Sequence, residues 1–275
     1  MSKLSDKLER DLASFVYKYK GKSIPLNIPY FLVKEGVRPG SKILNAERIG
    51  ANDHTTKTDV IIYFENSEPI KISLKLSNAD FYGNWYGHKR FLEEFGEESF
   101  SKMTAAATNW ANEWKNTAKA PFVGVSICFG KRPGRTGINF LDVFDKKDIM
   151  TICKGKGTGD KIANCLYITD DIPENLEKLF ANLKEISEDS IETIVENFKI
   201  AMRPINPMTE GTNRGKNIYA QFVPFRKLDK PTIITESEEL FKLGTFKIVE
   251  PICVNHNHIL NILEIKYNII IPRKK

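Results

Sequence analysis

Two adjacent strands predicted between residues 58 and 77 carry an acidic residue and a lysine that could act together. Asp59 opens an apolar run, and after a short polar turn the chain alternates between apolar and polar residues, which places Ser73 and Lys75 on the same side of the second strand. In such a hairpin the Asp59 carboxylate, the Leu74 carbonyl and the Lys75 amine can converge on one edge. A divalent cation takes oxygen ligands, and the charge that develops on a phosphate needs a cation nearby. These groups therefore suit phosphodiester hydrolysis.

The spacing of these residues resembles a known nuclease motif. Asp59 followed fourteen residues later by Ser73-Leu74-Lys75 is similar to the half-motif of the PD-(D/E)XK nuclease superfamily, which holds most type II restriction endonucleases. The resemblance implies that Asp59 and the Leu74 carbonyl bind Mg²⁺, with Mn²⁺ as the alternative ion. It also implies that Lys75 orients or helps to deprotonate the attacking water. The chain departs from the pattern at Ser73, which stands where the family has a second acid and could hold a water beside the metal.

Three glutamates are candidates for the missing metal ligand. In many relatives a glutamate on the first helix reaches the metal, and Glu9 is the matching position here, the alternative being an ordinary solvated side chain. In one subgroup of restriction endonucleases serine replaces the second acid, and a glutamate on the following helix takes its place. Glu93 and Glu94 lie 18 and 19 residues beyond Lys75, which is longer than that pattern. We therefore expect the metal ligands among Asp59, Leu74, Glu9, Glu93 and Glu94.

Two basic, glycine-containing segments are candidates for contact with DNA. The link between residues 130 and 137 and the polar loop within residues 203–225 supply the six expected DNA-binding residues Lys131, Arg132, Arg135, Asn213, Arg214 and Lys216. Arginine and asparagine side chains can each form two hydrogen bonds with guanine and adenine edges, respectively. The alternative for the second loop is a surface turn. A third glycine-rich stretch, residues 154–161 (KGKGTGDK), lacks the spacing of a phosphate-binding P-loop.

The pattern of apolar residues predicts an α/β protein. The first 130 residues read as helix, strand, strand, strand, helix, strand, the αβββαβ order of the restriction-endonuclease-like core, although other α/β layouts share it. The expected elements around the hairpin are a helix over 5–19, a strand over 42–49, one long or two short helices over 88–117 and a strand over 121–129. Further elements are expected as strands over 137–144, 232–234, 245–252 and 259–271 and a helix over 173–202.

The expected architecture is a central mixed sheet flanked by helices, with a C-terminal α+β extension. Residues 1–145 are predicted to form a nuclease-like catalytic core, and residues 146–275 an extension that contributes to DNA recognition. One continuous domain is the alternative.

The charge distribution favours a partner with a phosphate backbone. Residues 170–197 carry nine acidic residues and two lysines, so the rest of the chain carries +13 because the whole chain carries +6 and this segment −7. A lysine-rich protein without such a partner is the alternative. The four scattered cysteines indicate a reducing compartment, and neither a signal peptide nor an apolar run of membrane-spanning length is present, so we expect a cytoplasmic protein without a membrane partner.

Together these features lead to one main functional hypothesis and two rivals. The first is a metal-dependent endonuclease that hydrolyses phosphodiester bonds in double-stranded DNA, with a homodimer if both strands are cut, because two scissile bonds call for two active sites. The second is a non-catalytic nucleic-acid-binding protein on the same fold, favoured by the missing second carboxylate. The third is an interaction or structural protein whose hairpin only mimics the motif.

Overall fold

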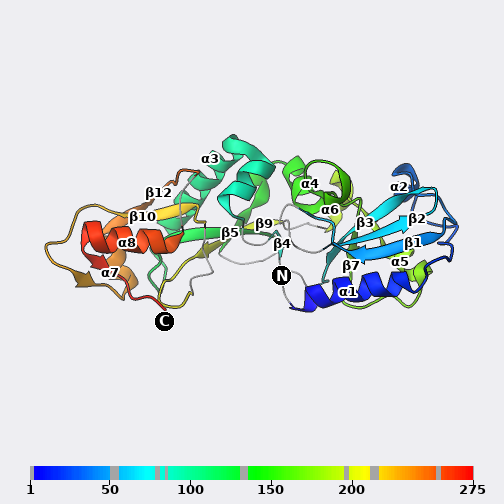
Figure 1. Cartoon of the computed structure of the whole chain (residues 1–275). Helices are drawn as coiled ribbons and strands as arrows, with labels where there is room; N and C mark the ends of the chain where they lie inside the picture. Colours follow the sequence, from blue (N-terminus) through cyan, green and yellow to red (C-terminus); the bar gives the residue numbers. More distant parts are fainter. Residues whose placement is uncertain are drawn as a thin grey trace. The chain divides into compact units, whose positions relative to one another are not determined.

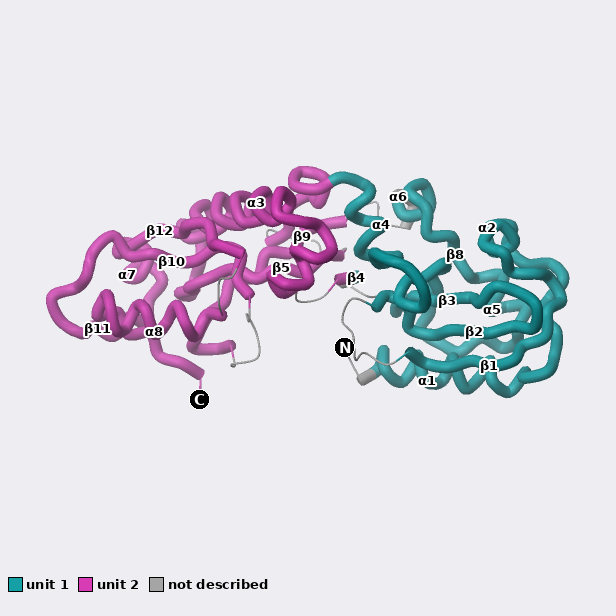
Figure 2. The backbone as a smooth tube through the Cα atoms, turned by 45° about the horizontal axis from the view of Figure 1, so that its top comes forward, with its two compact units in different colours: residues 1–82, 145–196 teal, residues 83–144, 197–275 magenta. Residues whose placement is uncertain are grey.

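The protein is a mixed α/β chain that forms two compact units. The computed structural model describes residues 3–49, 56–77, 81–83, 86–130, 136–194, 198–210, 217–251 and 255–274. Unit 1 contains residues 1–82 and 145–196, and unit 2 contains residues 83–144 and 197–275 (Figures 1 and 2). The chain thus passes between the units three times. Among the described residues, no helix combines the length and the hydrophobicity that spanning a membrane requires.

Unit 1 holds a mixed sheet with helices around it. Its elements are α1 (Lys3–Tyr17), α2 (Tyr30–Lys34), β1 (Ile43–Arg48), β2 (Val60–Phe64), β3 (Ser67–Lys75), α4 (Lys146–Lys154), a 3₁₀ turn (Gly159–Lys161), β7 (Cys165–Ile168), α5 (Leu176–Asn182), β8 (Lys184–Glu185) and α6 (Glu188–Ile194). The strand order is β1-β2-β3-β7-β8, in which β3 and β7 run parallel and the other neighbours run antiparallel. The central mixed sheet expected from the sequence is confirmed.

The prediction that the helix over 88–117 and the strand over 121–129 complete this sheet is wrong. These segments form α3 (His88–Trp114) and β5 (Gly124–Gly130), which belong to unit 2. The helix and strand that follow β3 within unit 1 are α4 and β7, separated from β3 by residues 83–144. Sequence order could not reveal this because β5 is buried along its whole length, as a strand inside a parallel sheet would be.

A hydrophobic core cluster of unit 1 forms where α1 packs on the hairpin strands. Leu8, Leu12 and Val16 recur one turn apart on α1, and these apolar side chains pack with alternate residues of the hairpin strands. On β3 these are Ile70, Ile72 and Leu74, all buried. Alternation therefore directs Ser73 and Lys75 to the opposite face.

Unit 2 is built on an antiparallel sheet that curls into a half-barrel. Its strand order is β12-β10-β5-β9-β6, with β4 (Phe81–Gly83) also pairing with β5. Its remaining elements are β6 (Gly137–Asn139), a 3₁₀ turn (Phe140–Asp142), β9 (Lys199–Pro204), β10 (Ala220–Pro224), β11 (Thr232–Ile233), α7 (Ser237–Lys242), β12 (Gly244–Lys247), α8 (His256–Tyr267) and β13 (Ile269–Ile270). A cluster of aromatic rings fills its core, namely Tyr86, Phe91, Phe95, Phe100, Phe129, Phe140, Phe144 and Tyr219. The helix α3 kinks at Gly96, where the backbone is not helical (φ 82°, ψ 178°).

Three secondary-structure predictions for the second half of the chain are wrong. Residues 173–202 form α5, β8, α6 and β9 instead of one helix, because Ser187 and Ser190 exchange hydrogen bonds that start a new helix. Residues 259–271 lie mostly in α8, since Asn255 caps the helix start at His258 N and Asn268 ends it in the left-handed region (φ 59°). These caps override the strand preference of the isoleucine-rich sequence. The strand expected over 137–144 ends at residue 139, where a 3₁₀ turn begins.

Candidate metal centre

The edge of the unit 1 hairpin brings the aspartate and the lysine together. Asp59 directly precedes β2 and is held by its backbone between β1 and β3, since its N–H donates to Ile72 O (2.8 Å) and its carbonyl accepts from Ile49 N (2.9 Å). Its Oδ2 accepts a hydrogen bond from Leu74 N (2.7 Å) and lies 3.7 Å from Lys75 Nζ.

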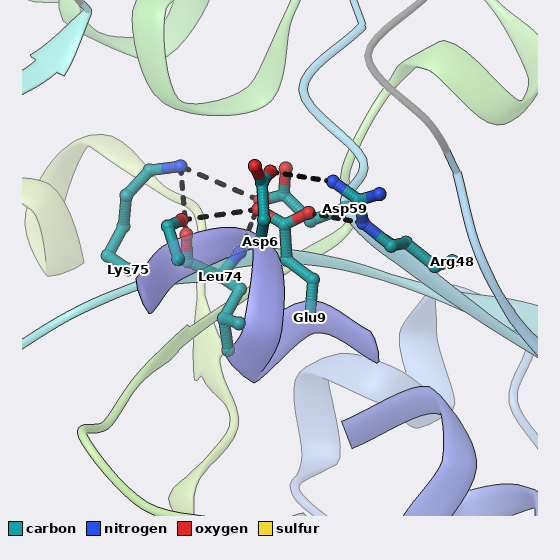
Figure 3. A network of polar contacts seen from close by, with 7 residues as sticks. Asp6, Glu9, Arg48, Asp59, Leu74 and Lys75 are labelled. Atoms are coloured by element: carbon teal, nitrogen blue, oxygen red, sulfur yellow. Dashed lines mark hydrogen bonds and ion pairs between the residues drawn. The ribbon is translucent and has the colours of Figure 1, made fainter. Parts of the chain in front are cut away.

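The Lys75 amine in turn donates to Leu74 O (3.1 Å; Figure 3). The side chains of Asp59 and Lys75 are 18% and 19% exposed, so both groups are partly accessible to solvent. The aspartate oxygen, the main-chain carbonyl and the lysine amine therefore converge on the same edge.

Glu9 lies in the same polar network, on α1. It is only 2% exposed, and its carboxylate accepts hydrogen bonds from Ser5 Oγ (3.2 Å) and Arg48 Nε (2.7 Å). Arg48 also donates from Nη2 to Asp6 Oδ1 (2.8 Å). The guanidinium thus joins two acidic side chains of α1 from the end of β1 (Figure 3). The solvated side chain that was the alternative for Glu9 is not what the structure shows.

The electrostatics of the network link Glu9 to Asp59. Burial raises the pKa of Glu9, and the negative charge of Asp59 raises this pKa further, whereas the hydrogen bond and charge of Arg48 lower it. The hydrogen bond to Glu9 correspondingly raises the pKa of Arg48. The two carboxylates are therefore close enough to repel each other. A cation bound between them would relieve this repulsion.

The available donors fit a hard divalent cation. The Glu9 and Asp59 carboxylates and the Leu74 carbonyl all offer oxygen, and Mg²⁺ in proteins commonly takes one or two carboxylates and keeps several waters. Ser73 adds a buried hydroxyl whose Oγ has no hydrogen-bond partner among the described residues. Within those same residues there is no cluster of three or more His, Cys, Asp or Glu side chains able to hold a metal. An ion here would thus depend on two carboxylates, a main-chain carbonyl and water.

The other residues expected at the site belong to unit 2 or lie outside the described residues. Glu93 and Glu94 belong to α3 of unit 2, where Glu93 is about half exposed and pairs with Lys89 (3.9 Å). Glu94 is buried there and accepts hydrogen bonds from Tyr86 Oη (2.6 Å) and Arg90 Nε (2.8 Å). The six expected DNA-binding residues Lys131, Arg132, Arg135, Asn213, Arg214 and Lys216 lie outside the described residues.

Sequence reasoning missed Arg48, which holds the Glu9 carboxylate in place. Its register position opposite Val60 puts it next to Asp59 on the neighbouring strand. A usable signal was present: Arg48 is the cation at the end of the predicted first strand, while Asp59 opens the second. In an antiparallel pair joined by a loop, these two positions are neighbours.

No protein-family model matches the chain, and no curated protein matches it significantly.

Proposed function

We propose that this protein is a divalent-metal-dependent deoxyribonuclease of the restriction-endonuclease type, which hydrolyses phosphodiester bonds in double-stranded DNA. The observation that carries the proposal is the 3.7 Å approach of Lys75 Nζ to Asp59 Oδ2 beside the Leu74 carbonyl and near the buried Glu9. This is the set of groups that the PD-(D/E)XK motif brings together. Mg²⁺ is the expected ion and Mn²⁺ the alternative.

The topology of unit 1 supports the proposal. With the five-residue helix α2 set aside, α1, β1, β2, β3, α4 and β7 follow in the order helix, strand, strand, strand, helix, strand, and the last strand lies parallel to the third. This αβββαβ arrangement is the one that the resemblance implies. Here unit 2 residues 83–144 separate β3 from α4.

The chemistry proposed for the chain's own groups follows from their positions. A divalent cation, when bound, would supply charge that polarises the scissile phosphate. Asp59, Glu9 and the Leu74 carbonyl would hold that cation, and Arg48 would keep Glu9 ionised and oriented. The Lys75 amine would orient the attacking water and offset negative charge on the phosphate. Ser73, with its unpartnered hydroxyl, would hold a water at the site.

A non-catalytic DNA-binding protein is the second candidate. The observation in its favour is that Ser73 replaces the second acid and that the described residues contain no group of three ligating side chains. Such a protein would use the same fold to bind DNA without cleaving it.

Nicking of supercoiled plasmid DNA in Mg²⁺ or Mn²⁺ tests the proposal. We expect Asp59→Asn and Lys75→Met each to reduce the nicking rate at least about 100-fold, the scale of losing one positioned catalytic group. Isothermal titration calorimetry should show that Asp59→Asn also loses metal binding, whereas Lys75→Met keeps it.

The matched controls are Lys42→Met and Glu65→Gln. Both residues are exposed and lie at the opposite end of the hairpin, where Glu65 N donates to Lys42 O. These variants should nick DNA like the wild type. Absence of nicking by the wild type, or equal nicking by all four variants, would rule out the nuclease.

A further inference from the structure

The glycine-rich segment of residues 154–161, called the lysine loop below, has no role in the site described above. It connects the end of α4 to the strand β7, and its residues from Lys156 to Lys161 are exposed. Because a helix precedes the loop and a strand follows it, the loop does not have the strand-loop-helix order of a P-loop. The glycine and lysine spacing of residues 154–161 also differs from that of a P-loop.

The lysine loop is fixed to the strands that carry the candidate site. The Lys161 carbonyl accepts from Lys57 N (2.9 Å), two residues before Asp59. The Gly159 carbonyl accepts from Lys71 Nζ (2.9 Å), on the same face of β3 as Ser73 and Lys75. Lys154 O, at the start of the loop, accepts from Ala163 N (3.0 Å). The loop is therefore held at both ends and near its middle.

Electrostatics place the base of the loop near the site lysine. Burial raises the pKa of the Cys153 thiol to about 11, and the positive charges of Lys75 and Lys57 oppose this rise. Cys153 directly precedes the loop, so Lys75 and the start of the loop share one electrostatic environment.

The backbone of the loop is open to a ligand. Gly155, Gly157 and Gly159 have φ values of +97°, +110° and +78°, which favour glycine, and at Gly157 and Gly159 an added Cβ would meet nothing within 4 Å. No described residue accepts a hydrogen bond from the N–H groups of Lys156, Gly157 or Thr158. At Gly157 and Gly159 glycine is thus required by conformation and not by packing, and the N–H groups of residues 156–158 remain unused by the described part of the chain.

The charge of the loop is strongly positive. The loop contains three lysines, Lys154, Lys156 and Lys161, and one acidic residue, Asp160. The side chain of Lys156 forms no ion pair with any residue that the structure describes. Lysine amines and main-chain N–H groups are typical donors to nucleic-acid phosphates. Such contacts position the duplex without reading its sequence.

We propose that the lysine loop binds the phosphate backbone of double-stranded DNA beside the Asp59 and Lys75 site. This inference rests on the proposed function, because it assigns to the loop the holding of the substrate that the site would cut. A preorganised loop loses little conformational entropy when it binds.

The experiment compares two triple variants of equal charge change. Lys154→Gln/Lys156→Gln/Lys161→Gln alters the loop, and Lys18→Gln/Lys20→Gln/Lys22→Gln alters exposed lysines just beyond the end of α1. The affinity for a fluorescent DNA duplex is measured by anisotropy in EDTA, so that no cleavage occurs, from 50 to 200 mM KCl. Circular dichroism melting confirms that each variant is folded.

The DNA affinity of the loop variant should depend less steeply on salt concentration than that of the wild type. Each phosphate contact contributes about −0.9 to the slope of log K against log salt, so losing three contacts makes the slope shallower by about 2.7. Between 50 and 200 mM KCl the wild type should therefore lose about 40-fold more affinity than the loop variant. The control variant should keep the wild-type slope.

The outcomes separate this inference from the proposed function. If the folded loop variant shows the wild-type slope of log K against log salt and still nicks DNA, the loop does not bind the phosphate backbone, and the proposed nuclease activity is unaffected. A shallower slope in the loop variant of a protein that never nicks DNA supports the loop and overturns the nuclease. Failure of the wild type to bind DNA overturns both.

Discussion

Replacing Arg48 by methionine tests whether the buried carboxylate of Glu9 depends on this one cation. The change removes the Nε donor at 2.7 Å from Glu9 and the Nη2 donor at 2.8 Å from Asp6, while keeping much of the aliphatic stem. Glu9 is 2% exposed, and removing one partner of a buried ion pair costs about 3–5 kcal/mol. Because Arg48 itself is 23% exposed and water can partly replace it, we expect the low end, about 3 kcal/mol at pH 8.

The pH dependence of this loss follows from the raised pKa of Glu9. The folded protein keeps the Glu9 proton over a pH range in which the unfolded chain has already released it, so this group lowers stability as the pH rises through its folded pKa. Arg48 opposes the rise in that pKa, and its removal therefore enlarges the effect. The Arg48→Met variant should lose less stability at pH 5, where Glu9 can take up a proton, than at pH 8.

A double-mutant cycle, with the free energy of unfolding measured in urea, gives the interaction energy between Arg48 and Glu9. Glu9→Gln removes the charge, so the combined variant Arg48→Met/Glu9→Gln should recover about 2 kcal/mol of the loss at pH 8, the scale of a hydrogen bond between charged groups. Asp6→Asn is the matched control, since Asp6 is about a third exposed and its pairing with Arg48 should couple by less than about 1 kcal/mol. Additive losses for Arg48 and Glu9, or equal losses at pH 5 and pH 8, would refute the assigned dependence.

Two further substitutions test the buried hydroxyl and the helix kink. Ser73→Ala removes a buried hydroxyl that has no partner among the described residues, so the metal-free protein should become more stable by about 1 kcal/mol in urea unfolding, and a loss of stability would show that the hydroxyl is satisfied. Gly96→Ala places a side chain at φ 82° and ψ 178° in α3, where space is open, and should cost about 1–3 kcal/mol from backbone strain alone. Calorimetric melting of Gly96→Ala that matches the wild type would contradict this.

The sequence determined the local features of the candidate site. Alternation along β3 fixed which residues share a face, and the apolar run after Asp59 fixed its place at the head of β2. Because strand alternation and tight turns are local rules, the pairing of Asp59 with the Ser73–Lys75 segment could be predicted without a structure. The helix expected over 5–19 and the strand expected over 42–49 are present as α1 (Lys3–Tyr17) and β1 (Ile43–Arg48).

Contacts between residues far apart in the sequence became known only from the tertiary structure. Arg48 reaches Glu9 across 39 residues, and α4 and β7 join the sheet of unit 1 only after the chain has passed through residues 83–144 of unit 2. Glu93 and Glu94 were candidate ligands although their distance from Lys75 exceeded the pattern, and they belong to α3 of unit 2. Hydrophobic periodicity reports that a segment is buried but not against which partner, because burial of apolar surface is non-directional. Which strand completes the sheet and which cation holds the buried acid therefore depended on packing between distant segments.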